Sequence, residues 1–345
     1  MASDPDAAVD PAGDPNRRPQ VDGGAHGESG RAAVVAAMTA NLAIAVMKFV
    51  AWLLTGASSL LAEAIHSVAD TTNQILLLRG GRDAARRADP EHPFGYGAAR
   101  YVSAFLVAVI LFSLGGVFAL YEAYHKWHQA RLGVQDELLS SRWWWVPLVV
   151  LVLAAFAEGA SLRTAVRESN PTRGRTPWPR FIRAAKAPEL PVVLLEDSAA
   201  VVGIVFALFG VGMTLLTRNP IFDVVGTALI GLLLIAVALT LGSETRSLLI
   251  GESASPEARR RIREALGATP GVERIIHLKT LHLGPDEVLL AAKISVEPTE
   301  SARRVAEIID AAEERIRAAE PTVTALYLEP DIYRDDHRPT DRGDV

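Results

Sequence analysis

The sequence predicts a membrane α-helical bundle of six transmembrane helices, followed by a small cytoplasmic α+β domain. Half of the 345 residues are hydrophobic, and they concentrate in six runs instead of spreading along the chain. Each run has roughly 20 residues, about the length that a helix needs to cross the hydrocarbon core of a bilayer. After Leu241 the apolar residues change to the alternating and helical-stripe patterns of a water-soluble domain.

The six spans are expected near residues 32–53, 57–78, 101–124, 144–165, 190–216 and 221–241. The second run carries a row of polar residues, which predicts a helix that faces the interior of the bundle and not lipid. These residues are Glu63, His66, Asp70, Asn73 and Gln74. Taken alone, this run could be a buried helix of a large soluble protein, but five neighbouring runs of membrane length favour a span.

Basic residues set the expected orientation of the bundle. The segment between spans two and three holds five Lys or Arg residues. The segment between spans four and five holds six, with a seventh, Arg163, at the end of span four. The three segments on the opposite side hold none, three and one. The positive-inside rule therefore places both termini in the cytoplasm. We expect a multi-pass integral protein of a bacterial plasma membrane, surrounded by lipid.

The ends of the chain and the cysteine content complete the expected domain organisation. Residues 1–30 are rich in Asp, Pro and Gly and lack an apolar segment, which predicts a disordered cytoplasmic tail and not a signal peptide. We then expect a transmembrane domain over 31–246, a cytoplasmic dimerisation or regulatory domain over 252–332 and a flexible tail over 333–345. Cysteine is absent, which excludes disulfides and thiolate metal ligands.

The soluble region reads as an α-β-β-α-β unit. Ser255 and Pro256 are typical of a helix start, and this helix should stop at Gly267. Strands are expected over 274–283, 288–296 and 323–329, with a second helix that opens near Thr299 and ends at Pro321. This order predicts a two-layer, ferredoxin-like domain. A unit of this size buries a modest core, so pairing with a second copy is expected.

Three titratable residues at membrane depth point to the chemistry. His66 and Asp70 lie four residues apart in the second run, which puts both side chains on one face of a helix. Asp197 lies in the fifth run. Each such side chain costs about 2.5–3.5 kcal/mol at the centre of a bilayer, so it is rarely present without a partner or a function. An imidazole and two carboxylates from two helices predict a site for a divalent cation, and hence a metal transporter.

Several segments together resemble the cation diffusion facilitator, or cation efflux, family. They are GASSLLAEAIHSVADTTNQ (56–74), HPFGYGAARY (92–101) and DVVGTALIGLLL (223–234). The runs LFSLGGVFALYEAYHKW (111–127) and PELPVVLLEDSAAVVG (188–203) look like the zinc transporter 9 branch. The resemblance covers roughly residues 30–330 and implies a homodimeric secondary transporter.

The resemblance also implies a site built from two motifs with four-residue spacing, one on the second span and one on the fifth. His66 and Asp70 match the first motif, and Asp197 matches the aspartate of the second. Val193 stands where the second motif has another ligand. Glu196 is the substitute that the sequence offers, with Asn41, Asn73 or a water as further alternatives for the fourth position.

We expect zinc as the transported ion, because a neutral imidazole with carboxylates suits zinc, whereas a richer oxygen set shifts preference toward manganese or iron. Protons and metal compete for the same groups, which favours proton antiport. Export of manganese, iron or cobalt by the same scaffold is the alternative, and a metal-sensing membrane protein is the alternative outside transport. The chain has no HExxH or phosphate-loop motif, so an enzyme is not expected. Neither a resident cofactor nor a nucleic-acid partner is expected.

Overall fold

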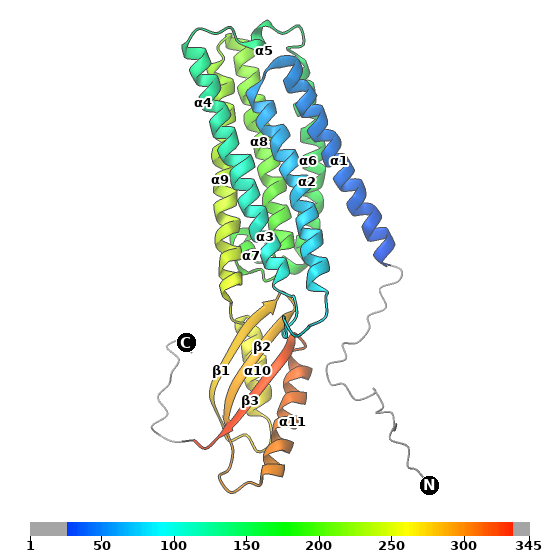
Figure 1. The fold of residues 1–345 in the computed structure, drawn as a ribbon, viewed down its shortest axis with the longest axis vertical. Coiled ribbons are helices and arrows are strands. Elements are labelled where there is room, and N and C mark those ends of the chain that lie inside the picture. Colours follow the sequence, from blue (N-terminus) through cyan, green and yellow to red (C-terminus); the bar gives the residue numbers. More distant parts are fainter. Residues whose placement is uncertain (1–25, 334–345) are drawn as a thin grey trace, which may run out of the picture. The chain divides into compact units, whose positions relative to one another are not determined.

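The computed structural model describes residues 26–333, and every expected element in that range is present (Figure 1). The predicted tails fall largely outside these residues, although helix α1 begins at His26, inside the predicted N-terminal tail. The helices of the N-terminal part are α1 (His26–Thr55), α2 (Ser58–Ala84), α3 (Ala99–Ile110), the π-helical segment η2 (Leu111–Val117), α4 (Phe118–Arg131), α5 (Glu137–Ser140), α6 (Val146–Arg173), α7 (Trp178–Ala184), α8 (Glu189–Thr217) and α9 (Ile221–Ile250).

Each of the six apolar runs forms a helix, as the hydropathy pattern predicted. Within residues 26–333, four helical stretches are long and apolar enough to cross a membrane: Ala99–Arg131, Val146–Arg173, Glu189–Thr217 and Ile221–Ile250. Helix α2 falls short because of its polar row, and the apolar part of α1 (Asn41–Thr55) is shorter. The chain therefore has a transmembrane helical domain with four strongly apolar helices, while the count of six spans stays a prediction.

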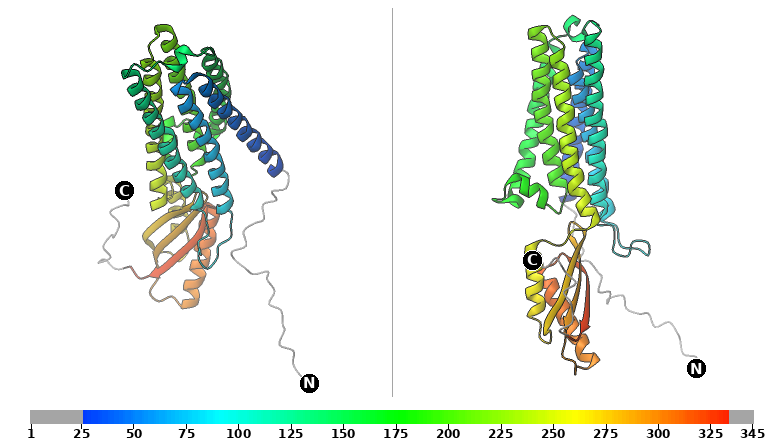
Figure 2. Two further views of the ribbon diagram at one scale, coloured as in Figure 1. Left: turned by 45° about the horizontal axis from the view of Figure 1, so that its top comes forward. Right: turned by 90° about the vertical axis from the view of Figure 1, so that its left-hand side faces the viewer.

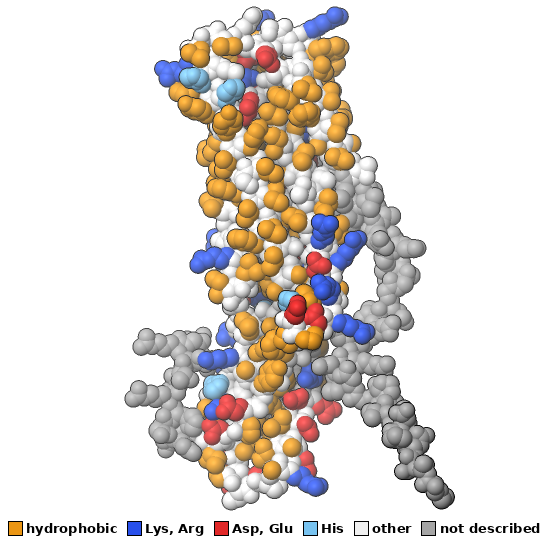
Figure 3. All heavy atoms as spheres, viewed as in Figure 1, with side chains coloured by type: hydrophobic (Ala, Val, Ile, Leu, Met, Phe, Trp, Pro, Cys, Tyr) orange, Lys and Arg blue, Asp and Glu red, His pale blue; other side chains and the backbone are white. Residues whose placement is uncertain are grey.

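The long helices from α2 to α9 run side by side in both views of Figure 2. Helix α8 packs against α6 and α9, while α2 packs against α3, α8 and α9. The core between them is aliphatic and includes Leu60, Leu111, Ile204 and Leu234. Hydrophobic side chains cover most of the face of these helices that is seen in Figure 3. The exposed hydrophobic residues of the helices include Phe112 and Leu114. Side chains of this kind suit contact with lipid.

The third long stretch changes its winding at its centre. Residues 111–117 are π-helical between the α-helices α3 and α4. Here Gly116 lies against Gly231 of α9, and a Cβ atom at Gly231 would come within 3.1 Å of the Gly116 carbonyl oxygen. The two glycines therefore let the helix backbones approach closely, which is a common basis for helix packing in membranes.

The C-terminal region folds as the α-β-β-α-β order predicted. It contains α10 (Pro256–Gly267), β1 (Arg274–Gly284), β2 (Glu287–Ser295), α11 (Ala302–Ala319) and β3 (Val323–Asp331). The strand order is β1-β2-β3, with β1 antiparallel and β3 parallel to β2. Alternate residues of β2, such as Leu290 and Ile294, share one core with Ile262 of α10 and Ile316 of α11. Both helices therefore cover one face of the sheet, which gives two layers.

Serine side chains cap both helices of this domain. The Ser255 hydroxyl accepts a hydrogen bond from the Ala258 amide at 3.1 Å, which confirms the predicted start of α10. Helix α11 begins at Ala302, three residues beyond Thr299, near which its start was expected. The Ser301 hydroxyl caps it by accepting a hydrogen bond from the Arg304 amide at 3.3 Å.

Candidate metal centre

His66 and Asp70 form the half of the site that α2 contributes. One helical turn separates them, and His66 Nδ1 lies 3.5 Å from Asp70 Oδ1. The imidazole is fully buried, and Asp70 is 8% exposed. Among the described residues, neither nitrogen of His66 has a hydrogen-bond partner, and Asp70 Oδ1 also lacks one. Because buried polar atoms are nearly always paired, unpaired imidazole nitrogens indicate a place for a ligand.

Helix α8 brings two carboxylates to α2. Glu196 is buried, and its Oε1 accepts a hydrogen bond from Asn73 Nδ2 of α2 at 2.6 Å. Asp197 is half-buried, and its Oδ2 accepts from the Ser161 hydroxyl of α6 at 2.8 Å. Glu196 and Asp197 both interact electrostatically with Asp70. The other three predicted site residues therefore lie near Asp70, between α2 and α8, close enough to interact with it electrostatically.

The four side chains do not converge on a single point, however. No group of three His, Asp or Glu side chains in residues 26–333 is close enough to hold a metal ion as it stands. Successive residues of a helix point about 100° apart, so Glu196 and Asp197 turn toward different neighbours. Closing the site around an ion would therefore require these side chains, or the helices that carry them, to move.

Asn73 is the better placed of the two amides that the sequence suggested as a fourth ligand. Its Oδ1 is buried and has no hydrogen-bond partner among the described residues, while its Nδ2 holds Glu196. It lies three residues from Asp70, on the same face of α2. Asn41 is half-buried on α1, and Val193 is half-buried on α8.

A lysine that the sequence pattern had not singled out lies beside this site. Lys48 of α1 is fully buried, and its Nζ donates to Glu63 Oε2 and to the Ser67 hydroxyl, each at 2.9 Å. It interacts electrostatically with His66 and Asp70. A charged residue within an apolar run of membrane length was the available signal. Glu158 of α6 is a further buried carboxylate that interacts with Asp70.

Comparison with known proteins places this arrangement in a family. Residues 34–250 match the cation efflux transmembrane domain, and residues 254–330 match the cytoplasmic domain of cation efflux proteins. The chain belongs to the cation efflux family. It is a membrane protein of a family of cation transporters, and no enzyme family is indicated.

Two groups of curated relatives of this cation efflux protein are informative. The proton-coupled zinc antiporter SLC30A9, mitochondrial, of Xenopus laevis is 32% identical over 268 residues, which are 76% of this chain and 46% of the relative. The human SLC30A9 protein is 32% identical over 267 residues, with coverage of 76% and 45%. The chain thus spans about half the length of these relatives. The magnetosome protein MamM of Magnetospirillum gryphiswaldense is 23% identical over 297 residues, or 84% of this chain and 85% of MamM.

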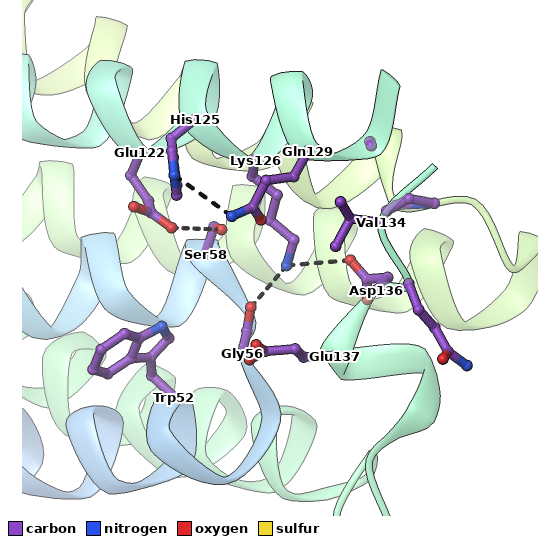
Figure 4. A pocket seen from close by; sticks show the side chains of 13 residues that line it. Trp52, Gly56, Ser58, Glu122, His125, Lys126, Gln129, Val134, Asp136 and Glu137 are labelled. Atoms are coloured by element: carbon purple, nitrogen blue, oxygen red, sulfur yellow. Dashed lines mark hydrogen bonds and ion pairs between the residues drawn. The ribbon is translucent and has the colours of Figure 1, made fainter. Parts of the chain in front are cut away.

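A separate polar cluster of this cation efflux protein lies where α1 meets α2 (Figure 4). It surrounds a cavity of about 270 Å³ whose lining includes Glu122, His125 and Glu137. Lys126 Nζ donates to the Gly56 carbonyl at 2.7 Å and to Asp223 Oδ2 at 3.0 Å. A buried ion pair therefore joins α4 to α9, and the same lysine holds the turn between α1 and α2.

The cytoplasmic domain contains a histidine and two carboxylates that could in principle bind a metal ion, and each of the three has a partner within the domain. His282 Nδ1 lies 3.1 Å from the Gly284 carbonyl, and burial lowers the pKa of His282. Glu329 and Asp331 both pair with Lys293, at 2.8 and 3.2 Å. These contacts favour structural roles for the three groups.

Proposed function

We propose that this protein exports a divalent cation, with zinc as the principal substrate, in exchange for protons. The transport site lies between α2 and α8 and uses His66, Asp70 and Asp197, with Glu196 or Asn73 completing it. The observation that carries the proposal is His66, a fully buried imidazole with two unpaired nitrogens beside Asp70. The name of the SLC30A9 relatives, proton-coupled zinc antiporter, supports the same ion and the same coupling.

The proposed topology has six spans with both termini in the cytoplasm. The six helical runs and the excess of basic residues in two connecting segments support it. The match of residues 254–330 to the family's cytoplasmic domain supports a cytoplasmic C-terminus. We further propose a homodimer in a bacterial plasma membrane, in which the cytoplasmic domain enlarges its modest core by pairing.

Proton exchange follows from the ligand chemistry. The imidazole and the carboxylates bind metal only when they are deprotonated, so each bound cation displaces protons from the same groups. Across an inside-negative potential of 100 mV, export of a divalent cation costs about 4.6 kcal/mol, and each returning proton offsets about 2.3 kcal/mol of this. Two returning protons would therefore balance the electrical work.

The identity of the metal depends on the fourth ligand. Three carboxylate or amide oxygens around one imidazole nitrogen would admit manganese, iron or cobalt as well as zinc. The second candidate function is thus the same export with one of these ions, and it is favoured by a donor set in which every ligand other than His66 supplies oxygen.

Transport by purified protein in liposomes tests the proposal. We expect an imposed pH gradient to drive zinc uptake, and Asp70→Ala and Asp197→Ala to abolish it. Asp310→Ala is the matched control, because Asp310 is an exposed carboxylate on α11 of the cytoplasmic domain. A panel of zinc, manganese, iron(II) and cobalt ranks the substrates.

Three results would reject parts of the proposal separately. Uptake that ignores the pH gradient would exclude proton exchange. Full uptake by both aspartate variants would exclude the site between α2 and α8. Absence of flux for every ion, in a protein that still binds zinc, would favour a sensor over a transporter.

A further inference from the structure

We infer that Glu63 is a second, transient binding point for the transported cation, and that Lys48 occupies it when the cation is absent. The inference rests on the proposed function, because it concerns the route of the ion after it leaves His66 and Asp70. It is supported by the burial of Glu63, by its unpaired oxygen, by the ion pair between Lys48 and Glu63, and by the position of Glu63 on the side of the site away from the cytoplasm.

Glu63 lies on α2, beside the proposed site. It is three residues before His66, so the two side chains share one face of the helix. The carboxylate is fully buried. Its Oε1 has no hydrogen-bond partner among the described residues. An unpaired carboxylate oxygen at this depth is costly unless a cation reaches it.

This free oxygen points toward α8, the helix that carries Glu196 and Asp197. A Cβ atom placed on Gly203 of α8 would collide with Glu63 Oε1, so only a glycine leaves room for the carboxylate there. Gly203 lies six residues beyond Asp197 along α8. Glu63 Oε1 is therefore between the same two helices that form the main site.

Glu63 on α2 and Gly203 on α8 both lie nearer the same end of the bundle than the proposed site does. Moving from His66 to Glu63 goes toward the start of α2, at Ser58, and moving from Asp197 to Gly203 goes toward the end of α8, at Thr217. In the proposed topology this is the side away from the cytoplasm. Glu63 is thus one turn further along the exit route than His66.

Lys48 holds the other oxygen of Glu63. Its ammonium donates to Glu63 Oε2 and to Ser67 Oγ, both at 2.9 Å, and its side chain is fully buried. A lysine carries its charge on a flexible four-carbon stem, so it can release a carboxylate and return to it. Lys48 therefore acts as a tethered cation that competes with the transported ion for Glu63.

The competition has two consequences for transport. A divalent ion that leaves His66 meets the free Glu63 oxygen and displaces the ammonium from the carboxylate. The nearby positive charge of Lys48 then repels the ion, so the ion does not settle there. When Lys48 pairs with Glu63 again, the ion can no longer return by the same route.

Zinc binding to the detergent-purified full-length protein tests the inference by titration calorimetry. We expect Lys48→Met to bind one zinc ion more per chain than the wild type, because Glu63 is then free. The double variant K48M/E63Q should return to the wild-type number, and Lys48→Arg should keep it. An unchanged number in Lys48→Met would overturn the inference.

Transport rates provide a second measurement in case Lys48→Met does not fold. We expect Glu63→Gln to slow zinc turnover by about tenfold while the zinc affinity of the main site is unchanged. The variant K48M/E63Q should be as slow as Glu63→Gln. If the ion pair served only the packing of α1 on α2, this charge-neutral double variant would transport at the wild-type rate.

The two proposals fail in different ways. Zinc transport that Asp70→Ala abolishes, with wild-type behaviour of the Lys48 and Glu63 variants, would reject only the second binding point. Wild-type protein without any divalent-cation flux would reject the proposed function itself.

Discussion

The side-chain amide of Asn73 on α2 donates a 2.6 Å hydrogen bond to Glu196 Oε1 on α8. This bond joins the two helices at the level of the proposed site and occupies one oxygen of Glu196. It also leaves Asn73 Oδ1 buried without a partner among the described residues. Either Glu196, after release from Asn73, or Asn73 itself can therefore supply the fourth ligand.

Substitution of Glu196 by glutamine distinguishes these alternatives. Glu196→Gln keeps an oxygen that accepts the Asn73 hydrogen bond but removes the charge. If Glu196 binds the ion, we expect the dissociation constant for zinc to rise at least tenfold, or about 1.4 kcal/mol, in titration calorimetry. An unchanged constant, together with weaker binding by Asn73→Ala, would assign the position to Asn73.

Substitution of Val193 can add a metal ligand, whereas the substitution of Glu196 removes a charge. It lies four residues before Asp197, so a histidine at this position would share a helix face with that carboxylate. We expect Val193→His to raise the affinity for zinc and lower the transport of manganese relative to zinc, because a second imidazole favours zinc over manganese. Competition between the two ions in liposomes measures the ratio. Val193→Ala is the control, and an equal ratio in both variants would contradict the prediction.

The sequence predicted the elements of the fold because their signals are local. Apolar runs of membrane length gave the helices, and the alternation of residues 288–296 gave the central strand of the sheet. The start of α11 was expected near Thr299, and the helix begins at Ala302, because two hydroxyl residues, Thr299 and Ser301, precede it and either can cap a helix. The local pattern does not distinguish them, and in the structure Ser301 is the cap.

The site was predictable only in part. His66 and Asp70 are an i, i+4 pair, so their proximity follows from helix geometry. The pairs Lys48–Glu63 and Asn73–Glu196 join residues 15 and 123 positions apart, so only the packing of the helices shows which side chain meets which. The same holds for Asp223, whose partners Ser58 and Lys126 lie 165 and 97 positions away.

Asp223 is the centre of the polar cluster near the start of α2. Its carboxylate is fully buried and accepts hydrogen bonds from Lys126 Nζ at 3.0 Å and from the Ser58 amide at 2.9 Å. Removal of one partner from a buried ion pair costs about 3–5 kcal/mol, because the other charge remains buried. We therefore expect Asp223→Asn to lower the thermal unfolding midpoint in detergent substantially. Asp310→Asn should leave the midpoint unchanged, and equal shifts in the two variants would contradict this role.

The cytoplasmic domain should lose stability in acid through Glu320, the residue that follows α11. Burial alone would raise the pKa of Glu320, but the Thr322 hydroxyl and the Arg261 guanidinium hold it below its ordinary value of 4.5. A carboxyl group whose pKa is lower in the folded state stabilises the fold at pH values above its ordinary pKa. This contribution disappears as the pH falls through the lower, folded-state pKa.

Hydrogen exchange of the full-length protein measures this effect. After correction for intrinsic exchange rates, we expect the protection of α11 and β3 to fall between pH 6 and pH 3 by more in the wild type than in Glu320→Gln. The glutamine variant lacks the titrating group, so its protection should already be lower at pH 6. Glu314→Gln, an exposed position on the same helix, should follow the wild type. Identical pH dependence in all three proteins would show that Arg261 and Glu320 do not contribute to the stability of the domain.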